Sequence, residues 1–472
     1  MYSYEAYFSN NYYNTKNPHT AKAKNAEPIS DGKKKAPVKH KFTRIMKEIP
    51  FNPTFSASSL RTELSSNDEK KKYNNLQKNL NRHSVKELEA LLKKGLLLNA
   101  DSADGSSVLD NLNKIITTPR AEGLDSKQLA QHLIATLNNP FNITQQFGNI
   151  PPQLEPKIVE NYMNDNNIQD ISQAKQEANV LHSGTCVAAS IEYSLASKKP
   201  AEFARFTEGL TSPNMSVDKK IHLDKLADNA LDAIWLLNAF EVPYKDETFH
   251  TAVLTFKPDK DAIVRAQIQT RDFDKGERTP IDVMMQSTFM QVGSQQAYNS
   301  ISDKRAGKFN QNDKGLIEFE KTFTESVIED KNKISVTYQK VDENARLTGY
   351  ETDMETLKRH LTQTLDLGDN VIVGYTQTDN NNVIINGHEI TVIGYKKDNN
   401  GKLKFICNDT DDNQAKPVEY TEDYLLPKIH HAALPKNVVK DDVKMVENWV
   451  EGLNKYQEQR QQQTVKDQAV AA

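Results

Sequence analysis

The sequence predicts an α+β protein in which a mainly helical half is followed by a half built from antiparallel strands. Two observations predict this class. Apolar residues recur at helical spacing through residues 58–145 and again from Cys186 to Phe240. β-Branched runs separated by turn residues dominate between Asn370 and Asp409. A chain of 472 residues is long for one compact core, so we expect two domains with tails.

Within this frame, we expect four regions. Residues 1–55 are a disordered basic and Tyr-rich arm, 56–148 a helical module, 153–435 the main domain, and 436–472 a C-terminal amphipathic helix with a Gln-rich tail. In the helical module, Ser84 and Glu87 form a capping-box pattern at the start of an apolar stripe. The helical module and the C-terminal helix are candidate surfaces for a protein partner.

The main domain contains further signals in chain order. We expect helices over 201–210 and 223–240, a hairpin of strands 251–256 and 262–268, a helix capped at Thr279, a polar surface insertion over 302–330, a strand over 333–341, a helix capped at Asp353 and a strand over 370–375. Met284, Met285, Phe289 and Met290 form an apolar stripe that is typical of a core rather than of a binding groove.

The composition argues against nucleic acid as a partner. Lys and Arg number 60 and Asp and Glu number 64, which gives a net charge of −4 and no excess of positive charge. The opening residues contain no apolar run typical of a secretory signal, and we expect no transmembrane segment. A cytoplasmic location is the default expectation, and export as an effector by a specialised secretion system is the alternative.

One of only two cysteines stands where a loop becomes a helix. Cys186 follows Gly184 and Thr185 and opens a run of small and apolar residues at helical spacing. The unpaired N–H groups at the start of a helix favour a thiolate, and the N–H of Cys186 can stabilise an oxyanion. A lone cysteine is more often a small buried hydrophobe, so a catalytic role requires a partner.

The candidate partner lies about two hundred residues further along the chain. His388 begins a β-branched strand, Asp398 to Gly401 form a turn, and the chain returns as a strand that ends at Asp409. This antiparallel return brings Asp409 or Asn408 beside His388. A side chain there fixes the imidazole tautomer and leaves the other ring nitrogen for a thiol.

These segments resemble the papain-like cysteine peptidase superfamily, which includes calpain-type enzymes and bacterial bacteriocin-leader peptidases. Gly184-Thr185-Cys186 is similar to the Gly-Ser-Cys signature of the family, and His388 followed by Gly394-Tyr395 is similar to its histidine strand. The resemblance covers residues 170–200 and 350–412. It implies a helical lobe facing an antiparallel β lobe. It also implies a Cys186, His388 and Asp409 triad, with Asn408 as the second choice for the third member.

The resemblance leaves the oxyanion side chain open. The family carries Gln six residues before the cysteine, where this chain has Val180. Gln176 is the nearest upstream glutamine and the candidate donor, and Asn179 and His182 are alternatives, beside the main-chain N–H of Cys186.

The implied activity is that of a thiol hydrolase, most simply a cysteine endopeptidase that acts on a protein or peptide through a covalent acyl-enzyme. Transglutaminases and deamidases use the same three groups. A catalytically inactive papain-like docking protein is the rival outside the enzymes.

We expect neither a cofactor nor a metal. His430 and His431 are placed past the core strands, without a spaced set of Cys or carboxylate ligands, and no phosphate-binding glycine loop is present. Cys407 is expected to face the core, and no disulfide framework is expected from two cysteines.

Overall fold

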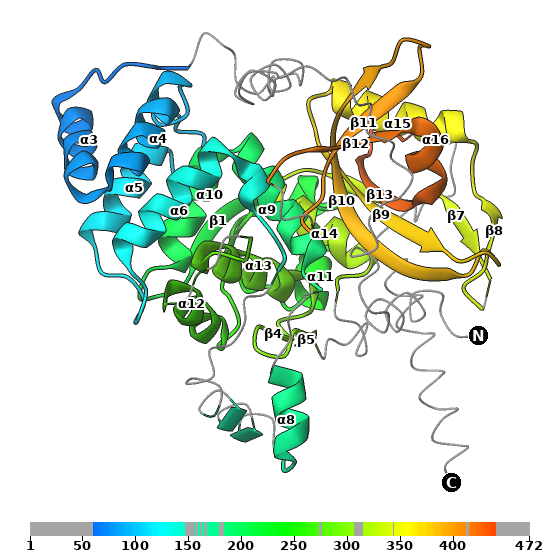
Figure 1. Cartoon of the computed structure of the whole chain (residues 1–472), viewed down its shortest axis with the longest axis horizontal. Helices are drawn as coiled ribbons and strands as arrows, with labels where there is room; N and C mark the ends of the chain where they lie inside the picture. The colour runs from blue at the N-terminus through cyan, green and yellow to red at the C-terminus, as the bar shows by residue number, and fades with distance from the viewer. Residues whose placement is uncertain are drawn as a thin grey trace, which may run out of the picture.

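The computed structural model has the mixed α+β architecture that the sequence predicts. It describes residues 60–146, 156, 159–160, 163–164, 168–178, 184–271, 273, 276–305, 315–342, 344–411 and 415–439. The predicted arm 1–55 and residues 440–472 of the predicted C-terminal helix and tail lie outside these residues. In Figure 1, helices gather on one side and the largest sheet on the other, with α9 between them.

The predicted helical module forms from well-capped helices. They are α3 (Asn67–Asn79), α4 (Arg82–Lys93), α5 (Val108–Thr117) and α6 (Ser126–Asn138), followed by the 3-10 turn η3 (Pro140–Asn142). A side-chain oxygen accepts a first-turn N–H at the start of each α-helix. The cap of α4 is Asn81 rather than the predicted Ser84, because Asn81 Oδ1 accepts the Ser84 N–H at 2.9 Å.

The helical module shares one hydrophobic core with the helices that follow it. These are α9 (Cys186–Lys198), α10 (Pro200–Leu210) and α13 (Pro280–Gly293), and their buried side chains form one cluster with those of α3 to α6. Helix α13 begins at the predicted cap, since Thr279 forms a capping box with Asp282. Its predicted Met and Phe stripe is buried. Helix α9 therefore packs against the helices of the N-terminal module.

A three-stranded antiparallel sheet lies within the helical half. Its order is β1 (Val217–His222), β3 (Thr251–Phe256), β2 (Tyr244–Thr248), and the chain between β1 and β2 forms η4 (Leu223–Lys225) and α11 (Ala230–Ala239). The predicted helix over 223–240 is thus shorter than expected.

The predicted second strand over 262–268 is wrong, because the chain forms helix α12 (Ala262–Arg271) there. Arg265 and Gln269 are buried together with Ala262, Ala266 and Ile268. Their spacing of three and four residues is helical, but two of the inward positions are polar, so the apolar residues alone looked like an alternating strand.

The main sheet has six antiparallel strands. Their order is β12 (Val418–Thr421), β11 (Leu403–Asn408), β10 (Ile384–Lys397), β9 (Val371–Thr378), β13 (Ile429–Pro435), β6 (Lys333–Thr337). Helix α15 (Met354–Asp366), capped by Asp353 as predicted, packs with Val371 and Val373, whereas Ile372 belongs to the core shared with α9. The sheet therefore has a buried face on each side.

The placement of His430 and His431 past the core strands is wrong. Both lie on β13, which is an inner strand between β9 and β6. Both side chains are buried.

The predicted surface insertion over 302–330 is also wrong for its second half. Residues 318–329 form helix α14 (Glu318–Glu329), most of which is buried. Its charges are paired inside the protein: Glu320 with Arg305, Lys321 with Glu389, and Glu325 with Lys333. A buried helix that carries paired charges has the composition of a surface segment. The sequence therefore predicted an exposed insertion where the chain forms a buried helix.

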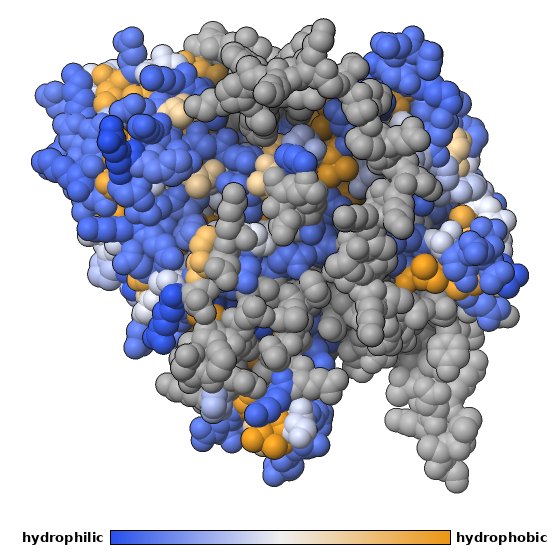
Figure 2. Space-filling model, in the orientation of Figure 1, coloured by the Kyte–Doolittle hydropathy of each residue, from blue (hydrophilic) through white to orange (hydrophobic). Residues whose placement is uncertain are grey.

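The remaining elements are short. They are α8 (Ile171–Ala178), β4 (Tyr298–Asn299), β5 (Lys304–Arg305), β7 (Gln339–Val341), β8 (Leu347–Tyr350), α16 (Glu422–Leu425) and the 3-10 turn η5 (Leu426–Lys428). On the face shown in Figure 2, the coloured surface is mainly hydrophilic and its hydrophobic residues form small separate patches. None of the described helices combines the length and the apolar character needed to cross a membrane.

Candidate active site

Cys186 is the first residue of α9, as its sequence context predicts. Thr185 occupies the N-cap position, but its hydroxyl donates to Gln286 Oε1 at 2.7 Å instead of capping the helix. The N–H groups in the first turn of a helix have no partner within the helix. The start of α9 is therefore a place where positive partial charge faces the Cys186 thiol.

His388 and Asp409 meet because a hairpin returns the chain. Strand β10 pairs antiparallel with β11, and the turn between them contains Gly401 at a φ of +81°, which glycine adopts without strain. Asp409 follows the last residue of β11, and its Oδ1 lies 2.8 Å from His388 Nε2. The N–H of Asp411 donates to the same oxygen at 3.0 Å, which fixes the carboxylate.

The His388 ring has hydrogen-bonding partners on both sides. Its Nε2 is bonded to Asp409, and its side chain is also hydrogen-bonded to the Cys186 thiol. Because Asp409 occupies Nε2, the nitrogen left for the thiol is Nδ1. The structure thus brings together the three side chains that the sequence singled out, from α9, β10 and the end of β11.

The surroundings of His388 favour its protonated form. Burial lowers the pKa of the imidazole, but the charge of Asp409 and the hydrogen bonds to Asp409 and Cys186 outweigh burial and raise the pKa well above its usual value. An imidazolium held in this way can stabilise a neighbouring thiolate.

Asn408, the second choice for the third member, does not share this geometry. Asn408 is paired with Thr391, and its buried amide nitrogen has no hydrogen-bond partner in the described part of the chain. Cys407 is buried in the core behind the sheet, as predicted, and burial raises the pKa of its thiol. Asp409, the first choice, is the residue bonded to His388.

Gln176 does not lie with these groups. It belongs to α8, which Figure 1 shows away from α9 and the main sheet, and its side chain is outside the described residues. The alternatives Asn179 and His182 are outside them as well. Of the predicted oxyanion donors, the main-chain N–H of Cys186 is the one that lies within the described residues.

Sequence reasoning missed Gln286, which connects several parts of the site. This buried side chain on α13 accepts from Thr185, donates to Glu192 Oε2 on α9 at 3.0 Å, and donates to the Thr144 carbonyl at 2.9 Å. It therefore fixes Thr185, the residue directly before Cys186. The available signal was a polar residue within the apolar stripe of a long buried helix.

A second missed feature is a strap, residues 144–146, that joins the helical module to the loop after Asp409. The Thr144 hydroxyl and the Gln145 N–H both donate to the Thr410 carbonyl at 3.0 Å. Gln145 Nε2 donates to Asp411 Oδ1 at 3.3 Å, and Gln146 Nε2 also bonds Asp411. The strap thereby supports the residues that position the Asp409 carboxylate.

A group of potential metal ligands occurs where strand β13 meets the start of helix α14. Glu318, His430 and His431 present donor atoms that all lie within 4.8 Å of one another. This group is separate from the Cys186, His388 and Asp409 side chains.

Comparison of the chain with protein-family models, with curated proteins and with solved structures finds no match. Function is therefore inferred from the geometry of the site.

Proposed function

We propose that this protein is a thiol hydrolase of the papain-like type, and specifically a cysteine endopeptidase that uses Cys186, His388 and Asp409. The observation that carries the proposal is the His388 ring, which is hydrogen-bonded to both the Cys186 thiol and the Asp409 carboxylate. A nucleophile, a base and a group that orients the base, each within hydrogen-bond reach of the next, are the requirement for nucleophilic catalysis by a side chain.

The arrangement of the two halves supports the same class. Helix α9 has the helical core on one side and strands β9 and β10 on the other. The nucleophile thus belongs to the helical half, while its base and the orienting carboxylate belong to the antiparallel half. This arrangement supports the proposal, because the resemblance implies a helical lobe facing an antiparallel β lobe.

In the proposed mechanism, His388 accepts the Cys186 proton and forms a thiolate and imidazolium pair. The sulfur attacks the carbonyl carbon of a peptide, and the Cys186 N–H stabilises the oxyanion. His388 donates its proton to the leaving amine as the C–N bond breaks and the thioester forms. His388 then removes a proton from water, which hydrolyses the thioester. Asp409 keeps Nε2 in place and stabilises the imidazolium throughout.

Alkylation by iodoacetamide at neutral pH tests the proposal, with modified sites identified by mass spectrometry. Cys186 and Cys407 are both buried, so burial does not distinguish them. Cys186 should nevertheless label much faster, because His388 pairs with its thiol, and His388→Ala should slow the labelling of Cys186. The matched control is His83→Ala, because His83 is an exposed histidine on α4. Equal and slow labelling of both cysteines would instead support a non-catalytic docking protein.

Incubation with a peptide library identifies the reaction subtype. A peptidase produces new peptide termini that are absent with Cys186→Ala. Ammonia release without cleavage would identify a deamidase, and cross-linked products would identify a transglutaminase. Either result would overturn the peptidase assignment while retaining Cys186 as the nucleophile.

A further inference from the structure

Two consecutive histidines on an inner strand point to the same place. Neighbouring strand residues normally face opposite sides of a sheet. However, His430 Nδ1 and His431 Nδ1 lie only 2.7 Å apart. The pairing of β13 with β9 changes register between Ile429 and His431. A bulge of this kind redirects side chains and is frequent beside functional sites.

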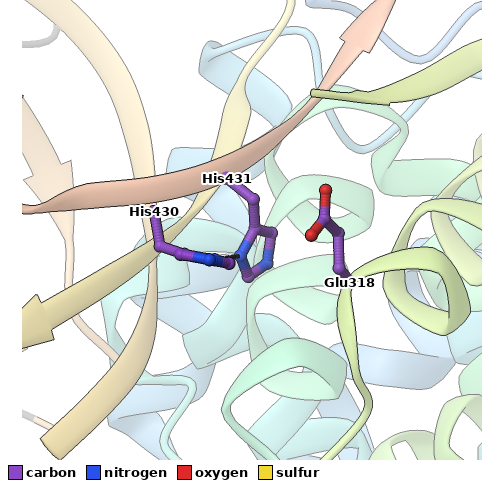
Figure 3. A group of neighbouring side chains, drawn as sticks. All are labelled: Glu318, His430 and His431. Carbon is purple, nitrogen blue, oxygen red and sulfur yellow. Dashed lines mark hydrogen bonds between the residues drawn. The ribbon is translucent and has the colours of Figure 1, made fainter. Parts of the chain in front are cut away.

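Glu318, at the start of α14, completes the group. Figure 3 shows the His431 ring between the His430 ring and the Glu318 carboxylate. Glu318 Oε1 accepts from Ser335 Oγ at 2.6 Å and from Thr337 Oγ1 at 2.8 Å, both on β6. The carboxylate is therefore held by hydrogen bonds from the sheet, as carboxylates that bind metals are.

His431 lies beside a second carboxylate. Its Nε2 lies 3.1 Å from Glu389 Oε1, and Glu389 Oε2 lies 3.1 Å from the Lys321 ammonium. A histidine that binds a metal through one nitrogen commonly has a carboxylate at the other. Here this arrangement leaves Nδ1 of His431 directed at His430.

The neighbouring strand leaves room for the His431 ring. Gly374 on β9 pairs with both His431 and Glu389. A Cβ at Gly374 would lie 2.3 Å from Cε1 and 2.5 Å from Nδ1 of the ring. A residue without a side chain is therefore required at the position where the imidazole crosses β9.

We propose that Glu318, His430 and His431 form a binding site for a divalent transition-metal cation, with Zn²⁺ as the best fit. Two imidazole nitrogens and one carboxylate oxygen are a donor set suited to zinc, and three protein donors leave a fourth tetrahedral position for water. Because the ligands come from β13 and α14, the bound ion links the sheet to the buried charged helix. The three proposed ligands are different residues from the Cys186, His388 and Asp409 group.

The charges and dimensions of the site are compatible with zinc. Glu389 is paired with the Lys321 ammonium at 3.1 Å, so the Glu318 carboxylate is the charge that a divalent cation would offset. Two nitrogens on a tetrahedral zinc ion with bonds of about 2.0–2.1 Å lie about 3.3 Å apart. Binding therefore requires the two rings to separate by about half an ångström.

The test is zinc binding by the full chain. The protein is treated with a chelator, desalted and titrated with ZnCl₂ in a calorimeter, and retained metal is measured by mass spectrometry. We expect one equivalent of zinc, a higher melting temperature with zinc, and a tetrahedral cobalt spectrum when Co²⁺ replaces zinc. Wild-type protein that retains no zinc would overturn the proposal.

Variants locate the ion. Glu318→Gln and His430→Gln should each abolish the bound equivalent, and Ser335→Ala should weaken affinity about 10- to 100-fold by releasing the Glu318 carboxylate. His132→Gln is the matched control, because His132 lies on α6 outside the group and should keep full binding. Ser335→Ala is a mild change, so it remains informative if a ligand variant does not fold. Unchanged zinc affinity in folded His430→Gln would place the ion elsewhere and overturn the proposal.

Discussion

Replacing Asp409 by Asn tests the reasoning about the active site most directly. The change removes the charge beside His388 but keeps the shape, and the Asn carbonyl can still accept the Asp411 N–H. The His388 and Asp409 side chains are only 8% and 12% exposed, and their atoms are 2.8 Å apart. A hydrogen bond to a charged group contributes about 1.5–3 kcal/mol, so the thiolate and imidazolium pair should become about 10- to 100-fold less populated.

The measurement is the rate of Cys186 labelling by iodoacetamide between pH 5 and pH 9. In Asp409→Asn, the rate near neutral pH should fall by about 10- to 100-fold, because less thiolate is present. Asp423→Asn is the control, since Asp423 is 66% exposed and pairs with Lys402 at the surface. A rate within about twofold of wild type would refute the role assigned to Asp409.

The same variant has a signature in stability. Asp409 and Cys186 raise the pKa of His388 in the folded protein despite burial, so this group stabilises the fold fully below its unfolded pKa of about 6.5. The contribution is lost as pH rises through the higher pKa of the folded state. The stability difference between wild type and Asp409→Asn should therefore be largest on the acid side of neutrality and shrink at alkaline pH. A difference that grows with pH would contradict the sign.

Three further predictions concern the framework, each measured by denaturant unfolding. Arg305→Met should lower the free energy of unfolding by about 3–5 kcal/mol, because it leaves the fully buried Glu320 carboxylate without its ion-pair partner. Adding Glu320→Leu should restore part of the lost stability. An effect of Arg305→Met below about 1 kcal/mol would contradict this prediction. Thr279→Ala should cost about 1 kcal/mol by removing the cap of α13, and an unchanged midpoint would show that the cap is dispensable. Burial, followed by repulsion from Lys199, lowers the pKa of Lys219 to about 8, so the unfolded chain binds more protons than the folded protein between about pH 8 and pH 10. The free energy of unfolding should therefore rise with pH in this range. Lys219→Met should abolish the rise, and a rise that persists in the variant would have to come from another group.

The parts of the site that could be predicted from the sequence are those fixed by local signals. The turn at Asp398 to Gly401 determines that the chain folds back, and this hairpin alone places Asp409 beside His388. The start of α9 was similarly visible in the change from loop residues to small apolar ones. The approach of Cys186 to His388 is a long-range contact, and the sequence supported it only through the order of the motifs.

The missed elements have a common physical cause. Helix α14 carries Glu320, Lys321 and Glu325 into the core, and α12 buries Arg265 and Gln269. Patterns based on hydrophobicity treat such positions as exposed, because the partners that neutralise them come from distant parts of the chain. The convergence of His430 and His431 on β13 could not be predicted for a related reason. The bulge between β13 and β9 depends on how the two strands pair, which the sequence of β13 alone does not specify.

The strap formed by residues 144–146 has a practical consequence for dissecting this protein. It bonds the Thr410 carbonyl and Asp411, next to the carboxylate that holds the imidazole. A shortened polypeptide that starts after this strap would retain Cys186, His388 and Asp409, yet it would expose the apolar faces of α9, α10 and α13 and release the loop after β11. Adding residues 60–146 as a separate chain should rescue such a fragment, in the way that split enzymes recover when their complementary pieces are mixed.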